Sequence, residues 1–154
     1  MNIFILDKNP EKAARMLCDQ HVVKMILESA QMLCTACWES GIEAPYKSTH
    51  KNHPCTIWVR ESLKNYDWLI KHANELCKEY TRRYNKTHKT QEIIEWCGGN
   101  KPKFKKKKLT PFAQAMPEKY KNTDAVQAYK DFYKNEKMGF ARWCKSRERP
   151  KEII

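Results

Sequence analysis

The stretch from Leu17 to Trp38, LCDQHVVKMILESAQMLCTACW, decides how this chain is expected to fold. Its apolar residues recur every three or four positions, which is the period of an amphipathic α-helix. At 100° per residue, a set of polar side chains falls within one stripe about 80° wide. That stripe holds His21, Lys24, Glu28, Gln31 and Thr35. The other side of the helix holds Val22, Val23, Ile26, Leu27, Ala30, Leu33, Cys34 and Cys37.

A narrow polar stripe on an otherwise apolar helix is typical of a helix that lines a cleft, although such a stripe can also simply face water. Glu28 is the member of the stripe that suggests chemistry. A carboxylate beside methionines and leucines would be partly shielded from water, an environment that suits acid–base work. The alternative for Glu28 is an ordinary surface ion pair with Lys24.

The remainder of the chain also predicts helices and almost no strand. Asn9 and Pro10 read as an N-cap followed by proline at the first helical position. Helical regions are expected at about 10–38 with a break near Asp19, at about 54–84 with a break near residues 63–65, at about 90–97, and from Thr123 or Asp124 to about Lys145. We therefore expect an all-α fold: a compact single-domain helical bundle over residues 1–154, with a short extended N-terminal arm.

The charge of the chain points to a polyanionic partner. It has 30 basic residues against 18 acidic ones, a net charge of +12 over 154 residues. Such a surplus creates a positive field that attracts nucleic acid, although a lysine-rich surface can also serve solubility alone. No stretch is apolar enough to span a membrane, and the first ten residues are too short and too acidic at Asp7 for a signal peptide. We expect a cytoplasmic monomer that binds double-stranded DNA and no membrane.

Two kinds of segment predict where nucleic acid would be contacted. Residues 46–53, YKSTHKNH, precede a helix start at Pro54, and helix N-termini attract anions. Basic clusters elsewhere supply contacts to the phosphate backbone. The residues expected to contact nucleic acid are Lys24, Gln31, Lys47, His50, Lys51, His53, Arg60, Arg82, Arg83, His88, Lys89, Lys105, Lys106, Lys107 and Lys108.

The seven cysteines are expected to be mostly buried free thiols, because their number is odd and most lie in apolar helical runs. Cys34 and Cys37, with His50, His53 and Cys55, offer enough ligands for zinc. Their CxxC spacing lies inside an apolar helix, however, whereas structural zinc sites place it on a turn. We therefore expect no metal and no cofactor.

The run Leu17-Cys18-Asp19-Gln20-His21, two valines, and then Glu28 seven residues after His21, resembles the signature of the phage-type pyrimidine-dimer DNA glycosylases, the endonuclease V kind. That family carries L-x-D-Q-H, two apolar residues, and a catalytic glutamate at the same distance. A second similarity is His53, which precedes an aromatic and apolar helical run, PCTIWVRESLKNYDWL, much as a histidine does in that family.

The resemblance implies a DNA glycosylase with AP lyase activity. In that family the N-terminal amine attacks the sugar C1′ of a nucleotide whose base is flipped out, and it forms a Schiff base. An α-amine suits this role because its ordinary pKa is only about 8. Carried over, Glu28 would be the acid/base, His21 a positioning contact to DNA, and Met1, or Asn2 if Met1 is lost, the bearer of the amine.

Some features leave the substrate and the class of activity open. Where the family has arginines, one position before and three after the glutamate, this chain has Leu27 and Gln31, so the damaged or modified base is not fixed. A non-catalytic basic accessory protein that binds nucleic acid is one alternative. The other is a nucleotide-modifying enzyme that uses His50, Lys51 and His53 for phosphate and Glu28 for proton transfer.

Overall fold

Asn9 and Pro10 start the first helix as the sequence predicts, since the Asn9 side chain accepts a hydrogen bond from the backbone N–H of Lys12. The structure, a computed structural model, describes residues 1–146 and 148–153. Within them lie six α-helices, one 3₁₀ turn and no strand. The elements are α1 (Pro10–Met16), α2 (Asp19–Glu39), α3 (Pro54–Glu61), α4 (Leu63–Tyr84), α5 (Gln91–Gly99), the 3₁₀ turn η1 (Glu118–Tyr120) and α6 (Ala125–Glu136).

Both expected breaks are present. Leu17 and Cys18 separate α1 from α2, and Ser62 alone separates α3 from α4. Ser62 has extended backbone angles, and its hydroxyl accepts a hydrogen bond from the N–H of Asn65, which caps α4. The fold is therefore all-α and compact, with the long helices α2 and α4 at its centre.

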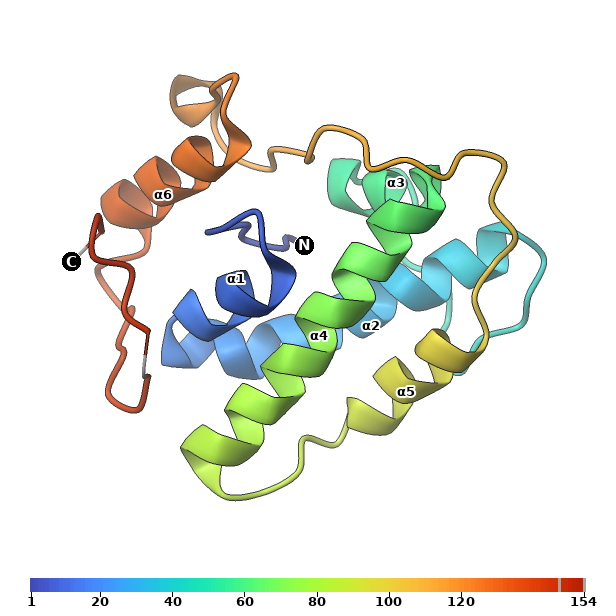
Figure 1. The fold of residues 1–154 in the computed structure, drawn as a ribbon, viewed down its shortest axis with the longest axis horizontal. Coiled ribbons are helices and arrows are strands. Elements are labelled where there is room, and N and C mark those ends of the chain that lie inside the picture. The colour runs from blue at the N-terminus through green and yellow to red at the C-terminus, as the bar shows by residue number, and fades with distance from the viewer. Residues whose placement is uncertain (147, 154) are drawn as a thin grey trace.

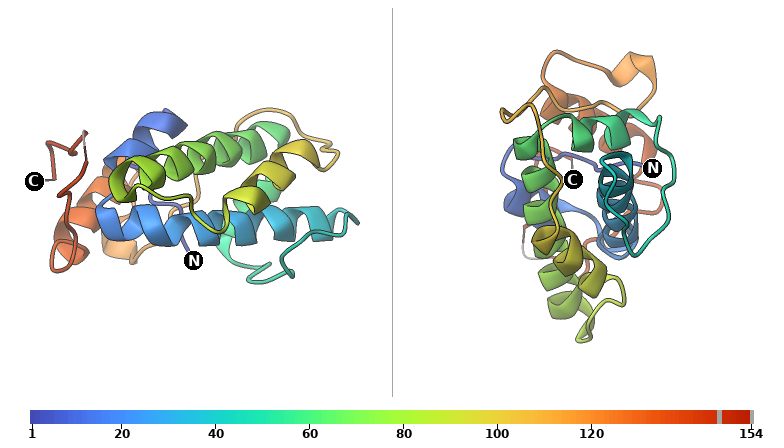
Figure 2. Two further views of the ribbon diagram at one scale, coloured as in Figure 1. Left: turned by 90° about the horizontal axis from the view of Figure 1, so that it is seen from below. Right: turned by 90° about the vertical axis from the view of Figure 1, so that its right-hand side faces the viewer.

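Helix α4 crosses the middle of the molecule and packs against α1, α2, α3 and α5 (Figure 1). The two views of Figure 2 show α2 and α4 as two layers, with the start of the chain on the α2 side. The N-terminal arm lies in the interior, where Ile3, Phe4, Ile5 and Leu6 are all buried. An arm so enclosed has a fixed position relative to α2, and this positions the site described below.

The last helix is shorter than the sequence suggested. We expected it to reach about Lys145, but α6 ends at Glu136. The chain after it instead packs against the start of α2. The backbone N–H of Asp19 donates to the carbonyl of Arg142 at 2.7 Å, and the N–H of Cys144 donates to the Asp19 carboxylate at 2.9 Å. These tertiary hydrogen bonds outweigh the helical preference of residues 137–145.

Among the described residues, no helix has the length and apolar character needed to cross a membrane.

Candidate active site

The carboxylate of Glu28 contacts the start of the chain. The backbone nitrogen of Asn2 donates to Glu28 Oε1 at 3.0 Å, and the terminal ammonium of Met1 lies 3.4 Å from the same oxygen. On the other side of the carboxylate, Lys24 Nζ lies 3.8 Å from Oε2. Glu28 is only 8% exposed, so these contacts are made away from bulk water. The family resemblance implied that Glu28 lies near an amine of Met1 or Asn2, and in the structure the nitrogens of both residues contact this carboxylate.

The side chain of Asn2 fixes the arm in this position. Its Oδ1 accepts hydrogen bonds from the backbone N–H groups of Ile3 and Phe4, at 2.8 and 3.2 Å. Its Nδ2 donates to the carbonyl of Ala115 at 2.8 Å. Phe4 has a positive φ of 60°, an unfavourable conformation for a residue with a side chain, and the contact with Asn2 helps to hold it. The chain terminus is therefore anchored by a segment more than a hundred residues away.

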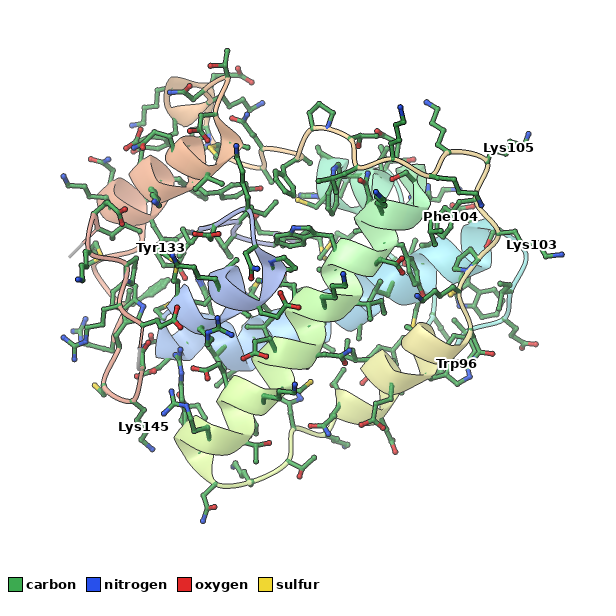
Figure 3. The ribbon with its side chains drawn as sticks, in the orientation of Figure 1. Trp96, Lys103, Phe104, Lys105, Tyr133 and Lys145 are labelled. Carbon is green, nitrogen blue, oxygen red and sulfur yellow. The ribbon has the colours of Figure 1, made fainter. Side chains whose placement is uncertain are left out.

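His21 packs against Phe4 of the N-terminal arm. Its ring stacks on Phe4, with the ring centres 4.2 Å apart, and its Nδ1 forms a 2.5 Å hydrogen bond with the hydroxyl of Tyr133. Burial, reinforced by the charges of Lys137 and Lys24, lowers the pKa of His21 to about 3. His21 is thus a neutral ring enclosed among aromatic side chains. Its hydrogen-bond partner Tyr133, which lies on α6, is labelled in Figure 3. His21 was predicted to contact DNA, but the structure buries it at 5% exposure and its ring contacts Phe4 of the arm and Tyr133.

His53 lies close enough to the site for the charges of the chain terminus and of Glu28 to affect its pKa. Burial lowers its pKa first, followed by the positive charge of the chain terminus and of His50, while Glu28 acts in the opposite direction. His53 Nδ1 accepts a hydrogen bond from the backbone N–H of Cys55 at 3.1 Å and so caps α3. Burial raises the pKa of the neighbouring Cys55 thiol to about 11, which keeps it protonated at neutral pH.

An open pocket of about 450 Å³ lies along α2 and is lined by Leu27, Gln31, Pro45, Tyr46, Lys47 and Thr49. The loop of residues 45–49, which lines one side of the pocket, is held to α2 by Thr35. The Thr35 hydroxyl donates to the carbonyl of Gln31 and accepts from the N–H of Thr49. The pocket therefore combines apolar surface from Leu27 with positive charge from Lys47.

The polar stripe of α2 is only partly solvent-facing. Its members Glu28 and Thr35 are buried under the arm and the loop, whereas Lys24 is exposed. Two residues expected on the apolar side are instead exposed: Val23 at 39% and Leu27 at 42%. The reason is tertiary: the arm and the loop pack over part of the polar stripe, and they leave the edge of the helix that carries Val23 and Leu27 open.

The other predicted contact residues do not all gather here. Lys51 lies 3.9 Å from Glu39 and lines, with Arg60, a different pocket of about 510 Å³. His88 Nε2 is 3.1 Å from the carbonyl of Val23, and Lys89 is exposed in the connection from α4 to α5. These positions are distributed over several elements, unlike the cluster at Glu28.

Arg82 and Arg83 belong to a structural ion-pair network. The side chain of Arg83 is fully buried, with Nη1 3.0 Å from Asp19 Oδ1 and Nη2 3.0 Å from Glu79 Oε1. Arg82 also binds Glu79, at 3.0 Å, and donates to the carbonyl of Lys145 at 2.8 Å. Burial opposes ionisation of Glu79, but the hydrogen bonds from both arginines outweigh it and lower its pKa. Because the donors of Arg83 are engaged inside the protein, Arg83 is not among the DNA contacts that we propose.

The lysine run at residues 105–108 lies away from Glu28. Both views of Figure 2 place this segment on the α4 side of the molecule and the chain terminus on the α2 side. Figure 3 marks Lys103, Phe104 and Lys105 at the outer edge, beyond the ends of α3 and α5. No pattern in the sequence indicated that the run and the carboxylate would be separated.

Buried thiols account for most of the cysteines, and only Cys144 is exposed. Cys34 Sγ lies 3.7 Å from Cys97 Sγ, and Cys37 contacts the hydroxyl of Tyr66. Over residues 1–146 and 148–153, no group of three or more histidine, cysteine or acidic side chains is arranged to hold a metal ion.

Two groups at the site were not predicted from the sequence. The carbonyl of Ala115 binds Asn2, but a backbone acceptor leaves no mark in a sequence. Tyr133 binds His21, but it lies at helical spacing with Tyr129 and Phe132, a pattern that indicates core packing.

The site can be set beside known proteins. Neither a curated protein nor a solved structure matches the chain. A protein-family profile described as pyrimidine dimer DNA glycosylase matches residues 1–92, a segment that contains the arm, Glu28, His53 and all of α4. The match covers more than half of the 154 residues. This chain therefore belongs to the pyrimidine dimer DNA glycosylase family.

Proposed function

We propose that the protein is a DNA glycosylase with AP lyase activity, in which the terminal amine is the nucleophile and Glu28 the acid/base. The observation that carries the proposal is that the nitrogens of residues 1 and 2 both contact Glu28 Oε1, at 3.4 and 3.0 Å. A terminal amine is therefore close to the carboxylate whether or not Met1 is removed. A pyrimidine dimer, the lesion that names the family, is the first substrate to test.

The first steps follow from this contact. Glu28 accepts a proton from the terminal ammonium, and the neutral amine attacks C1′ of the damaged nucleotide. The glycosidic bond breaks, and the base leaves with the bonding electron pair and takes a proton from water. The amine nitrogen then loses its second proton to solvent and forms a C1′=N bond, while the C1′–O4′ bond breaks and O4′ takes the proton held by Glu28. The product is a cationic imine joined to the protein.

The lyase step needs the same carboxylate again. Ionised Glu28 removes a proton from C2′, and the 3′ phosphate leaves with its bonding pair, which cuts the strand by β-elimination. Water then adds to the imine and releases the amine and an unsaturated aldehyde. Because Glu28 is shielded from bulk water, its interaction with the cationic imine is stronger than at an exposed site.

The surroundings suggest how DNA is held. Lys24, which pairs with the carboxylate, and Lys47, which lines the pocket along α2, are both exposed and suit contacts with phosphates. The pocket of about 450 Å³ lined by Leu27, Gln31 and Lys47 is large enough for a base turned out of the duplex. We further propose that residues 1–154 act as one domain, as a monomer inside the cell, on double-stranded DNA.

Reductive trapping tests the proposal. Borohydride added during the reaction with a duplex containing a thymine dimer, or an abasic site, reduces the imine to a stable amine and leaves protein and DNA covalently joined. We expect this adduct, and we expect peptide mapping to locate it at the first residue of the purified chain, which intact mass identifies as Met1 or Asn2. A chain extended by two glycines at its N-terminus is the control and gives no adduct at that site. An adduct at a lysine, or cleavage without any adduct, contradicts the proposed nucleophile.

A further inference from the structure

We propose that the lysine run, Lys105 to Lys108, forms a second DNA-binding surface that holds a separate duplex segment through its phosphates. This inference extends the proposed function, because it assumes that a first duplex occupies the α2 face over Glu28. Both views of Figure 2 place residues 105–108 on the opposite, α4 side of the molecule. A duplex over the chain terminus and a duplex bound to residues 105–108 would therefore lie on different sides of the molecule.

The run differs from the other lysines of this protein because four cations are adjacent in the chain and all of them lack a carboxylate partner within its described part. Some lysines elsewhere on the surface, such as Lys12, Lys78 and Lys121, have a carboxylate oxygen within 4.0 Å. All four lysines of the run are exposed, and none has a carboxylate that close among the residues the structure describes. Adjacent unpaired cations repel one another, so a polyanion is the partner that gains most from binding there.

The backbone of the run is fixed to the start of α4. The N–H groups of Leu63 and Lys64 donate to the carbonyls of Lys106 and Lys107, at 3.0 and 3.1 Å. The Asn65 side chain holds Thr110 through two hydrogen bonds, at 2.7 and 3.0 Å. The segment is therefore ordered before it binds anything, which lowers the entropy cost of binding. The positive end of the α4 dipole adds to the potential of the lysines.

The chemistry of the surface suits phosphates rather than bases. The aromatic residue of the segment, Phe104, packs against Tyr66 with ring centres 5.6 Å apart, so it is engaged in the protein. Pro102 is buried as well. What remains exposed in residues 105–108 is lysine alone, and lysine contacts to phosphate carry no sequence information. We therefore infer binding of duplex DNA irrespective of sequence or damage.

A bridging experiment tests this. One undamaged duplex is fixed to beads through biotin, a second carries a fluorophore, and the full-length protein is added at rising salt. The test variant replaces Lys105, Lys106, Lys107 and Lys108 with alanine. The matched control replaces four exposed lysines on other elements, Lys8, Lys119, Lys134 and Lys151, and so has the same net charge. We expect the wild-type protein to capture the second duplex, the control to retain most of the capture, and the test variant to lose about tenfold or more, because each lost phosphate contact weakens binding.

Other outcomes overturn the inference. It fails if the wild-type protein binds one duplex but captures no second one at any salt concentration. It also fails if the two variants bridge equally, as they would if bridging came from a protein dimer. Finally, it fails if the test variant loses affinity for a single duplex as much as it loses bridging, because the run would then belong to the first duplex's footprint. Undamaged DNA is used throughout, so failure of the glycosylase proposal leaves this test intact.

Discussion

The hydroxyl of Tyr133 on α6 and Nδ1 of His21 on α2 form a 2.5 Å hydrogen bond that joins two parts of the chain separated by 112 residues. His21 lies within the segment that matches the family, and Tyr133 lies beyond it. The same tyrosine oxygen lies 3.4 Å from the backbone nitrogen of Cys18. The C-terminal part of the chain therefore helps to hold the residue on which the N-terminal arm rests.

Removal of this hydroxyl is expected to destabilise the protein. Tyr133→Phe leaves His21 Nδ1 and the Cys18 N–H without their partner in a buried place, which costs about 1–3 kcal/mol of unfolding free energy. Urea unfolding followed by far-UV circular dichroism measures the loss. Tyr120→Phe, at a half-exposed tyrosine of η1, is the control and should change stability by less than about 0.5 kcal/mol. Equal effects of the two substitutions would contradict a supporting role for Tyr133.

The carboxylate of Glu28 is expected to matter for rate more than for binding. Glu28→Gln keeps the size of the side chain and an acceptor for the arm but cannot take a proton. We predict a fall in single-turnover cleavage of about 10²- to 10⁴-fold, with affinity for the damaged duplex within about threefold of wild type. Glu39→Gln alters a carboxylate at the far end of α2, which pairs with Lys51, and should retain the wild-type rate. Full activity in the Glu28→Gln variant would refute the proposed mechanism.

The buried histidines predict a dependence of stability on pH. Burial lowers the pKa of His72 to about 4 and that of His21 to about 3, both from an ordinary value of 6.5. Between pH 6.5 and pH 4 the unfolded chain binds protons at these residues and the folded chain does not. The free energy of unfolding therefore falls as the pH is lowered through this range, by at most about 1.4 kcal/mol per pH unit for each histidine.

Urea midpoints measured at pH 7, 6 and 5 give this slope. His72→Gln removes one titrating group, so we expect a smaller loss of stability between pH 7 and pH 5, while His21, His53 and His88, whose pKa values are also lowered by burial, keep part of the slope. The arginines lower the pKa of Glu79 from its ordinary value of 4.5, so this carboxylate contributes little to the slope between pH 7 and pH 5. An identical slope in wild type and variant would show that His72 is protonated in the folded chain.

The two adjacent arginines are expected to differ. Arg83→Met leaves Glu79 and Asp19 without their buried cation, and the free energy of unfolding should fall by about 3–5 kcal/mol. Arg82→Met removes a more exposed partner of the same carboxylate, for which we expect a loss of about 1 kcal/mol or less. Denaturant unfolding of both variants provides the comparison. If Arg83 instead contacts DNA, its substitution will weaken DNA binding while leaving stability almost unchanged.

The helices were predictable because their signals are local. Asn9-Pro10, Ser62 and Asp124 each start a helix through a side chain that accepts backbone N–H groups within three residues, so neighbouring letters are sufficient to find them. The end of α6 was not predictable, since it depends on contacts between Asp19 and residues near 143. The pairing of Glu28 with the chain terminus was predicted only through the family resemblance, because nothing local connects residues 1 and 28.

By itself, the sequence determined the helical class, the excess of positive charge, and the motif from Leu17 to Glu28 by which the chain resembles the family. These properties depend on residue type and on spacing within a helix turn. Only the tertiary structure decided which charges meet. It placed the terminal amine on Glu28, enclosed Arg83 between two carboxylates, and put the lysine run on the opposite face. The physical reason is that a charged side chain acts over a few ångströms in space, and chain folding alone sets which residues lie that close.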